Sequence, residues 1–106
     1  MAQSLFNGPH VAGDVSLTFV GRYISQLSVQ ATAIGTGNVS GQIIIEGSNT
    51  GNDWVPVAQL TVSGSGRATD GGMAQTNWEF LRARIVSLSA DSVVCSMLTQ
   101  GFHYGT

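Results

Sequence analysis

The sequence has 106 residues, the usual size of one domain, and only 9% of them are charged, against about 25% in an ordinary soluble domain. Its formal net charge is −2 and it has no basic run, which argues against nucleic-acid binding through phosphate neutralisation. No stretch approaches the roughly 20 apolar residues of a membrane span, and with a single cysteine the sequence offers no intrachain disulfide.

Uncharged polar side chains carry most of the expected surface. Such a surface loses water at a lower cost than a charged one, because no full charge is desolvated. Lysine, which keeps sheet edges of free proteins apart, does not occur in the sequence. We therefore expect much of the surface to lie against neighbouring subunits; a low-charge secreted or viral protein is the alternative. One predicted strand face is uncharged throughout, at Gln26, Ser28, Gln30 and Thr32.

The first thirteen residues combine turn-forming residues with two large apolar ones, Leu5 and Phe6. This composition predicts an extended N-terminal arm over residues 1–13 that orders only against a neighbour. Thirteen extended residues span up to about 40 Å, so Leu5 and Phe6 are candidate contacts with a sister subunit or partner. The alternative is a frayed terminus.

From residue 14 onward, apolar and polar residues alternate with a period of two, and no helical period competes with it. The alternation predicts strands over residues 14–20, 23–33, 39–48, 54–62, 78–88 and 92–100. Between them lie clusters of Gly, Asn, Asp and Ser, the residues of tight turns, at 35–38, 49–53, 63–66, 70–72 and 87–91.

Short strands at this spacing are typical of an all-β fold. We predict a single domain, an antiparallel β-sandwich or jelly-roll-like barrel over residues 14–100, followed by a C-terminal tail at 101–106. Pro56 cannot donate to a ladder, so its strand is predicted to lie at an edge or a bulge.

Four residues are predicted to form the structural core. The continuous apolar run 43–45 is typical of a central strand covered on both faces, which places Ile43 and Ile45 inside. Trp54 and Trp78 each stand beside a predicted strand, where core packing explains them better than an exposed sugar-binding role.

Residues that carry chemistry are scattered. The six acids occur singly, and His10 and His103 fall in the two terminal segments, far from a rigid scaffold. Two histidines are too few for a structural zinc site, and Cys95 is expected to be a buried, inert thiol. We therefore expect no catalytic site, no metal and no cofactor, and no enzymatic activity.

Arg82 and Arg84 share one face of a predicted strand, opposite the apolar residues that alternate with them. Two interpretations remain open. The arginines either lie on a solvated face and pair with acids such as Glu46 and Glu79, or they contact another subunit through bidentate hydrogen bonds.

Two segments within residues 42–98 carry a more specific pattern. The first is a strand followed by Ser48-Asn49-Thr50-Gly51-Asn52-Asp53-Trp54, and the second is Trp78-Glu79-Phe80-Leu81-Arg82-Ala83-Arg84. Together they resemble small β-sandwich proteins of tailed bacteriophage particles. The hairpin is also similar to one in discoidin-type carbohydrate-binding sandwiches, although Thr50 stands where that hairpin usually has Asp.

The phage resemblance implies a virion structural protein, in first place a capsid decoration (cement) subunit that binds the major-capsid lattice and stabilises the shell. It implies the major capsid protein or other virion proteins as partners, and a homo-oligomer, with a trimer favoured by analogy. Alternatives are a tail, neck or fibre component, or a carbohydrate-binding module for host adsorption. The N-terminus lacks the features of a signal peptide, so we expect synthesis in the host cytoplasm and a final location in the virion.

Overall fold

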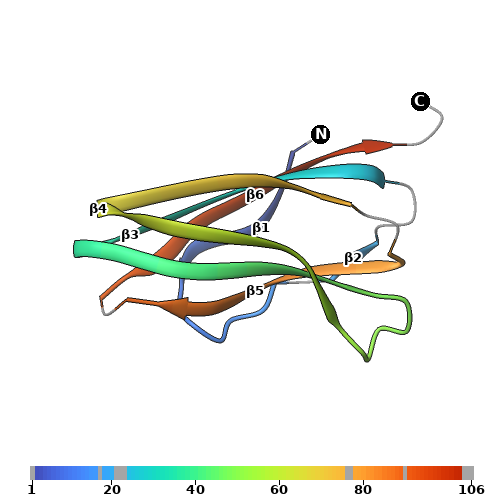
Figure 1. Ribbon diagram of the computed structural model, residues 1–106, viewed down its shortest axis with the longest axis horizontal. Coiled ribbons are helices and arrows are strands. Elements are labelled where there is room, and N and C mark those ends of the chain that lie inside the picture. The colour runs from blue at the N-terminus through green and yellow to red at the C-terminus, as the bar shows by residue number, and fades with distance from the viewer. Residues whose placement is uncertain (1, 17, 21–23, 76–77, 90, 104–106) are drawn as a thin grey trace.

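The computed structural model describes residues 2–16, 18–20, 24–75, 78–89 and 91–103. In this part of the chain no helix is long and apolar enough to cross a membrane. Its regular elements are strands (Figure 1): β1 (Ala2–His10), β2 (Phe19–Val20), β3 (Ile24–Ser48), β4 (Val55–Gln75), β5 (Phe80–Leu88) and β6 (Val93–His103).

The long strands β3 and β4 fold back on themselves. Twenty-five residues of straight strand extend roughly 80 Å. The longest dimension of the molecule is 45 Å, although β3 has 25 residues. In Figure 1 both strands run to one end of the molecule and return. The two halves of β3 also have different neighbours, because residues 24–34 pair with β6 and residues 41–48 pair with β5.

The bends create two layers. Layer A contains β1, β6, the first half of β3 and the second half of β4; layer B contains the second half of β3, the first half of β4, β5 and β2. All pairs are antiparallel. The predicted all-β antiparallel sandwich is therefore confirmed, in a single compact unit.

Glycine forms the bends. The register between β3 and β4 shifts between Ile34 and Asn38, where Gly37 has a φ of 77°, and Gly66 across the ribbon has a φ of 76°. Residues that carry a side chain rarely adopt a positive φ, whereas glycine adopts it readily. The turn chemistry predicted at 35–38 and 63–66 thus bends two continuous strands, instead of ending them.

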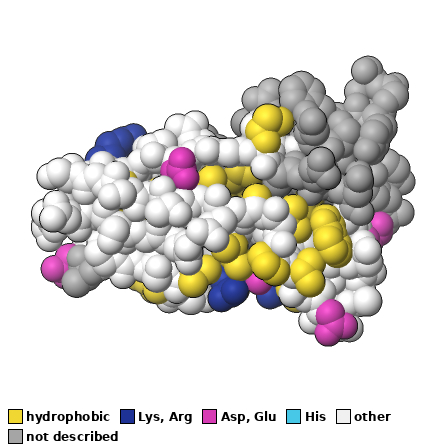
Figure 2. Space-filling view, in the orientation of Figure 1, with side chains coloured by type: hydrophobic (Ala, Val, Ile, Leu, Met, Phe, Trp, Pro, Cys, Tyr) yellow, Lys and Arg dark blue, Asp and Glu magenta, His cyan; other side chains and the backbone are white. Residues whose placement is uncertain are grey.

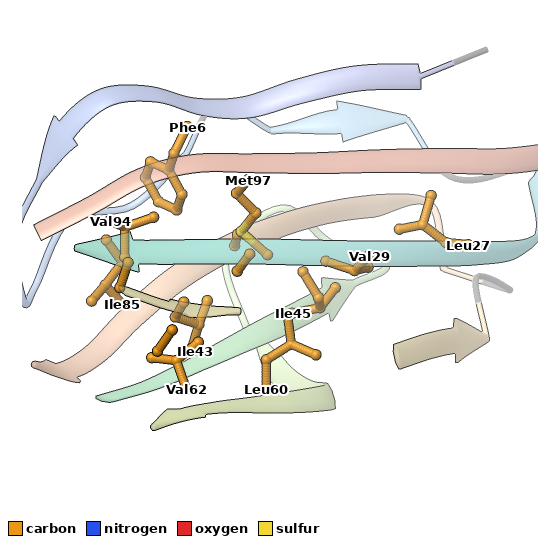
Figure 3. Packing of buried hydrophobic residues seen from close by; sticks show 14 of the residues in the cluster. Phe6, Leu27, Val29, Ile43, Ile45, Leu60, Val62, Ile85, Val94 and Met97 are labelled. Carbon is orange, nitrogen blue, oxygen red and sulfur yellow. The ribbon is translucent and has the colours of Figure 1, made fainter. Parts of the chain in front are cut away.

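The core lies between the layers (Figure 3). Ile43, fully buried, stands in register between Leu60 of β4 and Ile85 of β5, so three strands of layer B contribute to one row. Ile45 is 1% exposed. Layer A adds the opposite side of the cluster, with Leu27, Val29, Ala31, Ala33, Val94 and Met97.

Trp78 is partly buried and packs against this cluster. Its indole occupies the space above Gly47, where a Cβ atom would lie 2.6 Å from Cγ of Trp78. The tryptophan therefore closes one end of the core because its neighbour in β3 has no side chain.

The N-terminal segment differs from the predicted free arm. Residues 2–10 form β1, which pairs with β6 from Ala2 opposite Gln100 to His10 opposite Val94. Phe6 is 1% exposed in the chain's own core, and Leu5 packs against that core. Burial of this ring outweighs the turn-forming composition around it, so the assignment of Phe6 to a partner contact is corrected.

The C-terminal tail predicted over residues 101–106 is wrong for its first three residues. Residues 101–103 belong to β6, and residues 104–106 lie outside the described residues. The strand predicted over residues 14–20 is regular only in β2, with an isolated bridge from Val15 to Arg84. Here the hydroxyl of Ser16 accepts a hydrogen bond from Ala83 N at 2.8 Å and replaces a ladder bond.

Asp14 stabilises the start of the connection between β1 in layer A and β2 in layer B. Its carboxylate accepts a hydrogen bond from Val11 N at 3.0 Å and lies 3.1 Å from Nδ1 of His10. The bond from the Val11 backbone, followed by the contacts with His10, lowers the pKa of Asp14. The His10 ring in turn packs against Phe6, with 4.7 Å between the ring centroids.

Pro56 occupies the position expected of it. β4 pairs only with β3 among the described strands, and the register shifts between Ile45 and Glu46, which face Ala58 and Pro56. A bulge at an edge is where the missing N–H of proline does least harm. Farther along the same edge, the carboxylate of Asp70 accepts a hydrogen bond from Thr61 N at 2.9 Å.

Candidate functional site

The outer side of layer B presents a regular set of cross-strand rows, which we call the ladder face. Its centre is the outward set of β3, Gln42, Ile44 and Glu46, which alternates with the core residues. The register adds their neighbours on either side: Thr61 and Ser87 beside Gln42, Gln59 and Arg84 beside Ile44, Pro56 and Arg82 beside Glu46.

A buried carboxylate organises one end of this face. The side chain of Glu46 is 7% exposed; its Oε1 accepts a hydrogen bond from Nε of Arg82 at 2.9 Å and its Oε2 one from Nε of Arg84 at 3.3 Å. A buried charge is tolerated when it is paired and hydrogen-bonded. Of the acids that the sequence offered as partners, the structure thus pairs both arginines with Glu46.

Trp54 belongs to this cluster and not to the core. Its ring lies under the guanidinium of Arg82, with 4.1 Å between Cζ and the ring centroid, in a cation–π arrangement. Trp54 is only partly buried and lies outside the core cluster, so the prediction that it is a core residue is corrected. The physical reason is that the loop before β4 delivers the indole to the outer side of the sheet, where a cation covers it.

Replacing Trp54 with alanine should therefore cost about 0.5–2 kcal/mol of the free energy of unfolding, the range of a cation–π contact, and not the roughly 3–5 kcal/mol of an emptied core site. Chemical denaturation of the purified variant measures this, with Trp54→Phe as the control that keeps an aromatic ring. A loss in the core range would contradict the outer placement of Trp54.

The loop that positions Trp54 is held by its own hydroxyl groups. Oγ of Ser48 accepts hydrogen bonds from the backbone N–H of Thr50 at 3.1 Å and of Gly51 at 2.9 Å. Oγ1 of Thr50 accepts from Asn52 N and from Asp53 N, each at 3.1 Å. Thr50 thus supplies the hydrogen-bond acceptor that an aspartate side chain provides in such turns. The turn therefore stays closed with Thr50 at the position where the similar hairpin usually has Asp.

The other end of the ladder face is a shallow open depression of about 410 Å³. It is lined by Ser40, Gly41, Gln42, Thr61, Ser87, Leu88 and Ser89. Oγ of Ser89 accepts from Ser40 N at 3.0 Å and donates to the carbonyl of Asn38 at 3.2 Å, which fixes the rim. Sequence reasoning missed this site, because its only signal is the short polar segments near 40–42 and 87–89.

The remaining candidates do not come together. Among the described residues, no group of three or more His, Cys, Asp or Glu side chains could hold a metal ion. His10 contacts Asp14, while the side chains of His103 and Cys95 lie outside what the structure describes, so the expected burial of the thiol stays a prediction.

No family model and no curated protein matches this sequence. Solved structures do resemble the fold. The SPBc2 prophage-derived protein YomS has a TM-score of 0.57 at 12% identity, with 94% of this chain and 92% of that one covered. The PBSX exported protein XepA has a TM-score of 0.56 at 17% identity, and the match covers 100% of this chain but 38% of XepA. A carbohydrate-binding module of Cellvibrio mixtus lichenase 5A, solved with cellotriose, has a TM-score of 0.55 at 7% identity, with 97% and 87% covered.

Proposed function

We propose that this chain is a structural subunit of a bacteriophage particle, in first place a capsid decoration protein that binds the major capsid protein and stabilises the shell. It works by adhesion and not by catalysis. The observation that carries the proposal is the ladder face, in which a buried carboxylate fixes two arginines on the outside of a rigid sheet.

The ladder face has the properties of a surface made for contact. An exposed apolar residue accompanies its arginines, since Val15 pairs with Arg84 and is 45% exposed. Arginine is enriched at protein interfaces and lysine is depleted, and pre-ordered side chains lose less entropy on binding. Figure 2 shows few charged side chains on the visible surface. Basic, acidic and hydrophobic side chains lie together at its lower edge.

The similarity to the SPBc2 prophage-derived protein YomS supports the phage assignment at the level of the fold. The proposal includes a homo-oligomer, with a trimer favoured by analogy with capsid decoration proteins. A place in the tail, neck or fibre is the nearest alternative, because the same adhesive face would serve there.

Co-sedimentation with undecorated capsids, assembled from the major capsid protein of the same genome, tests the proposal. The full-length protein should pellet with the capsids and saturate at a fixed ratio to the capsid protein. The variant Arg67→Gln, which removes an exposed arginine of β4 away from the ladder face, should bind equally well. Absence of the wild-type protein from the pellet would refute decoration, and antibody labelling of intact virions would then show whether the protein lies in the tail.

A second candidate function is carbohydrate binding during host adsorption. The depression lined by hydroxyl and amide groups favours it, as does the fold shared with a module solved with cellotriose. None of the seven residues lining the depression is aromatic, so a sugar ring would find no stacking surface there. A glycan array with the purified protein separates this function from adhesion to capsids.

A further inference from the structure

We propose that Arg82 and Arg84 form a binding site for a carboxylate side chain of a protein partner. The inference rests on the proposed adhesive function and specifies the chemistry of its contact. It begins from the charges of the cluster: two guanidinium groups share one carboxylate, Glu46, so one positive charge remains in excess.

The donors needed for a second carboxylate are present. Each arginine uses Nε to reach Glu46. Among the residues that the structure describes, neither guanidinium has a further hydrogen-bond or ion-pair partner, which leaves the Nη groups of both. The side chains of Arg82 and Arg84 are 25% and 39% exposed, so an incoming group can reach them from solvent.

The site is ordered before a ligand arrives. Arg82 lies between the carboxylate of Glu46 and the ring of Trp54, which fixes the plane of its guanidinium. A planar, oriented fork matches the two oxygens of a carboxylate, and little rotamer freedom is lost when it binds. Glu46 therefore acts as a positioning residue for the two arginines.

The electrostatics favour an isolated carboxylate over a polyphosphate chain. The whole protein has a net charge of −2, so it does not attract a polyanion at long range. At short range, Val15 stands directly beside Arg84 in register and is 45% exposed. An Asp or Glu with apolar neighbours on a partner surface matches both the cations and this apolar rim.

A pair of blocked peptides tests the site. Acetyl-Val-Glu-Val-amide and acetyl-Val-Gln-Val-amide differ in the carboxylate alone, and each is titrated into the full-length protein at constant ionic strength. Nuclear magnetic resonance follows the arginine Nε–H and Trp54 indole N–H signals. We expect the Glu peptide to bind about tenfold more tightly than the Gln peptide, the ratio that one charge-assisted contact provides.

The variants assign the preference to this cluster. Arg84→Gln should bring the ratio close to one, and so should the combined variant Glu46→Met, Arg82→Met, Arg84→Met, which leaves no charge buried. Arg67→Gln removes an equal charge elsewhere and should keep the wild-type ratio. Equal affinity for both peptides, an unchanged ratio in Arg84→Gln, or tighter binding of inorganic phosphate than of the Glu peptide at the same signals would overturn the proposal.

The outcome is independent of the capsid experiment. Capsid binding that survives in Arg84→Gln, together with no preference for the Glu peptide, would retain the decoration function and reject the carboxylate site. A clear Glu preference without capsid binding would retain the site and reject the capsid as its partner.

Discussion

Replacing Phe6 with alanine is expected to lower the free energy of unfolding by about 3–5 kcal/mol, which is the usual cost of emptying a large buried aromatic site. The ring is 1% exposed and belongs to the main hydrophobic cluster, although it lies on an edge strand. Its removal leaves a cavity beneath β1, the edge strand of layer A. Equilibrium denaturation in urea measures the loss.

Val11→Ala is the matched control for Phe6→Ala. Val11 follows β1 closely in sequence but is 53% exposed, so its truncation should change stability by no more than about 0.5 kcal/mol. If the two variants were equally stable, the N-terminal segment would be a free arm, as the sequence predicted, and Phe6 would not contribute to the core.

The second large effect is expected at the ladder face. Replacing Arg82 and Arg84 together with methionine should cost about 3–5 kcal/mol, because the carboxylate of Glu46 is left buried and unpaired. The loss should be much larger than that of Glu46→Gln, since the two arginines are 25% and 39% exposed and can turn to water when the acid is gone.

The combined variant in which Glu46, Arg82 and Arg84 are all methionine separates the two possible causes of this loss. Apolar replacement of a whole buried ion cluster is often neutral for stability. The triple variant should therefore recover most of the stability that the double variant loses. If the triple variant were as unstable as the double one, packing of the arginine stems, and not the orphaned charge, would account for the effect.

The sequence predicted the fold well where one physical signal dominated. Period-two alternation identified the strands of layer B, and the inability of Pro56 to donate placed it at an edge bulge. The bends of β3 and β4 could not be foreseen, because Gly37 and Gly66 carry the same turn chemistry whether a strand ends or bends. The N-terminal strand was missed because the burial of Phe6 depends on a long-range pairing with β6.

The candidate site was predictable only in its residue types. Two arginines two residues apart share a strand face in any register, and that much was evident. Their convergence on Glu46 depends on the pairing of β3 with β5, which sequence periodicity does not specify. Trp54 was misassigned because the period of two places it on the same side as Leu60 and Val62. The register shift beside Pro56 breaks that period, and the loop before β4 carries the indole to the outer side.

From the doubled-back ribbon of β3 and β4 we expect a definite order of folding. Its strands are joined by the short loop that ends at Trp54, so their pairing closes a small loop and loses little chain entropy. Because both strands pass through both layers, this one hairpin already presents the strand edges with which β5 and β6 pair. The pairing of Ala2 with Gln100 joins nearly the two ends of the chain and gains nothing until that framework exists. A growing chain can thus complete most of its sandwich and still wait for its last strand before β1, made first, has a place to dock.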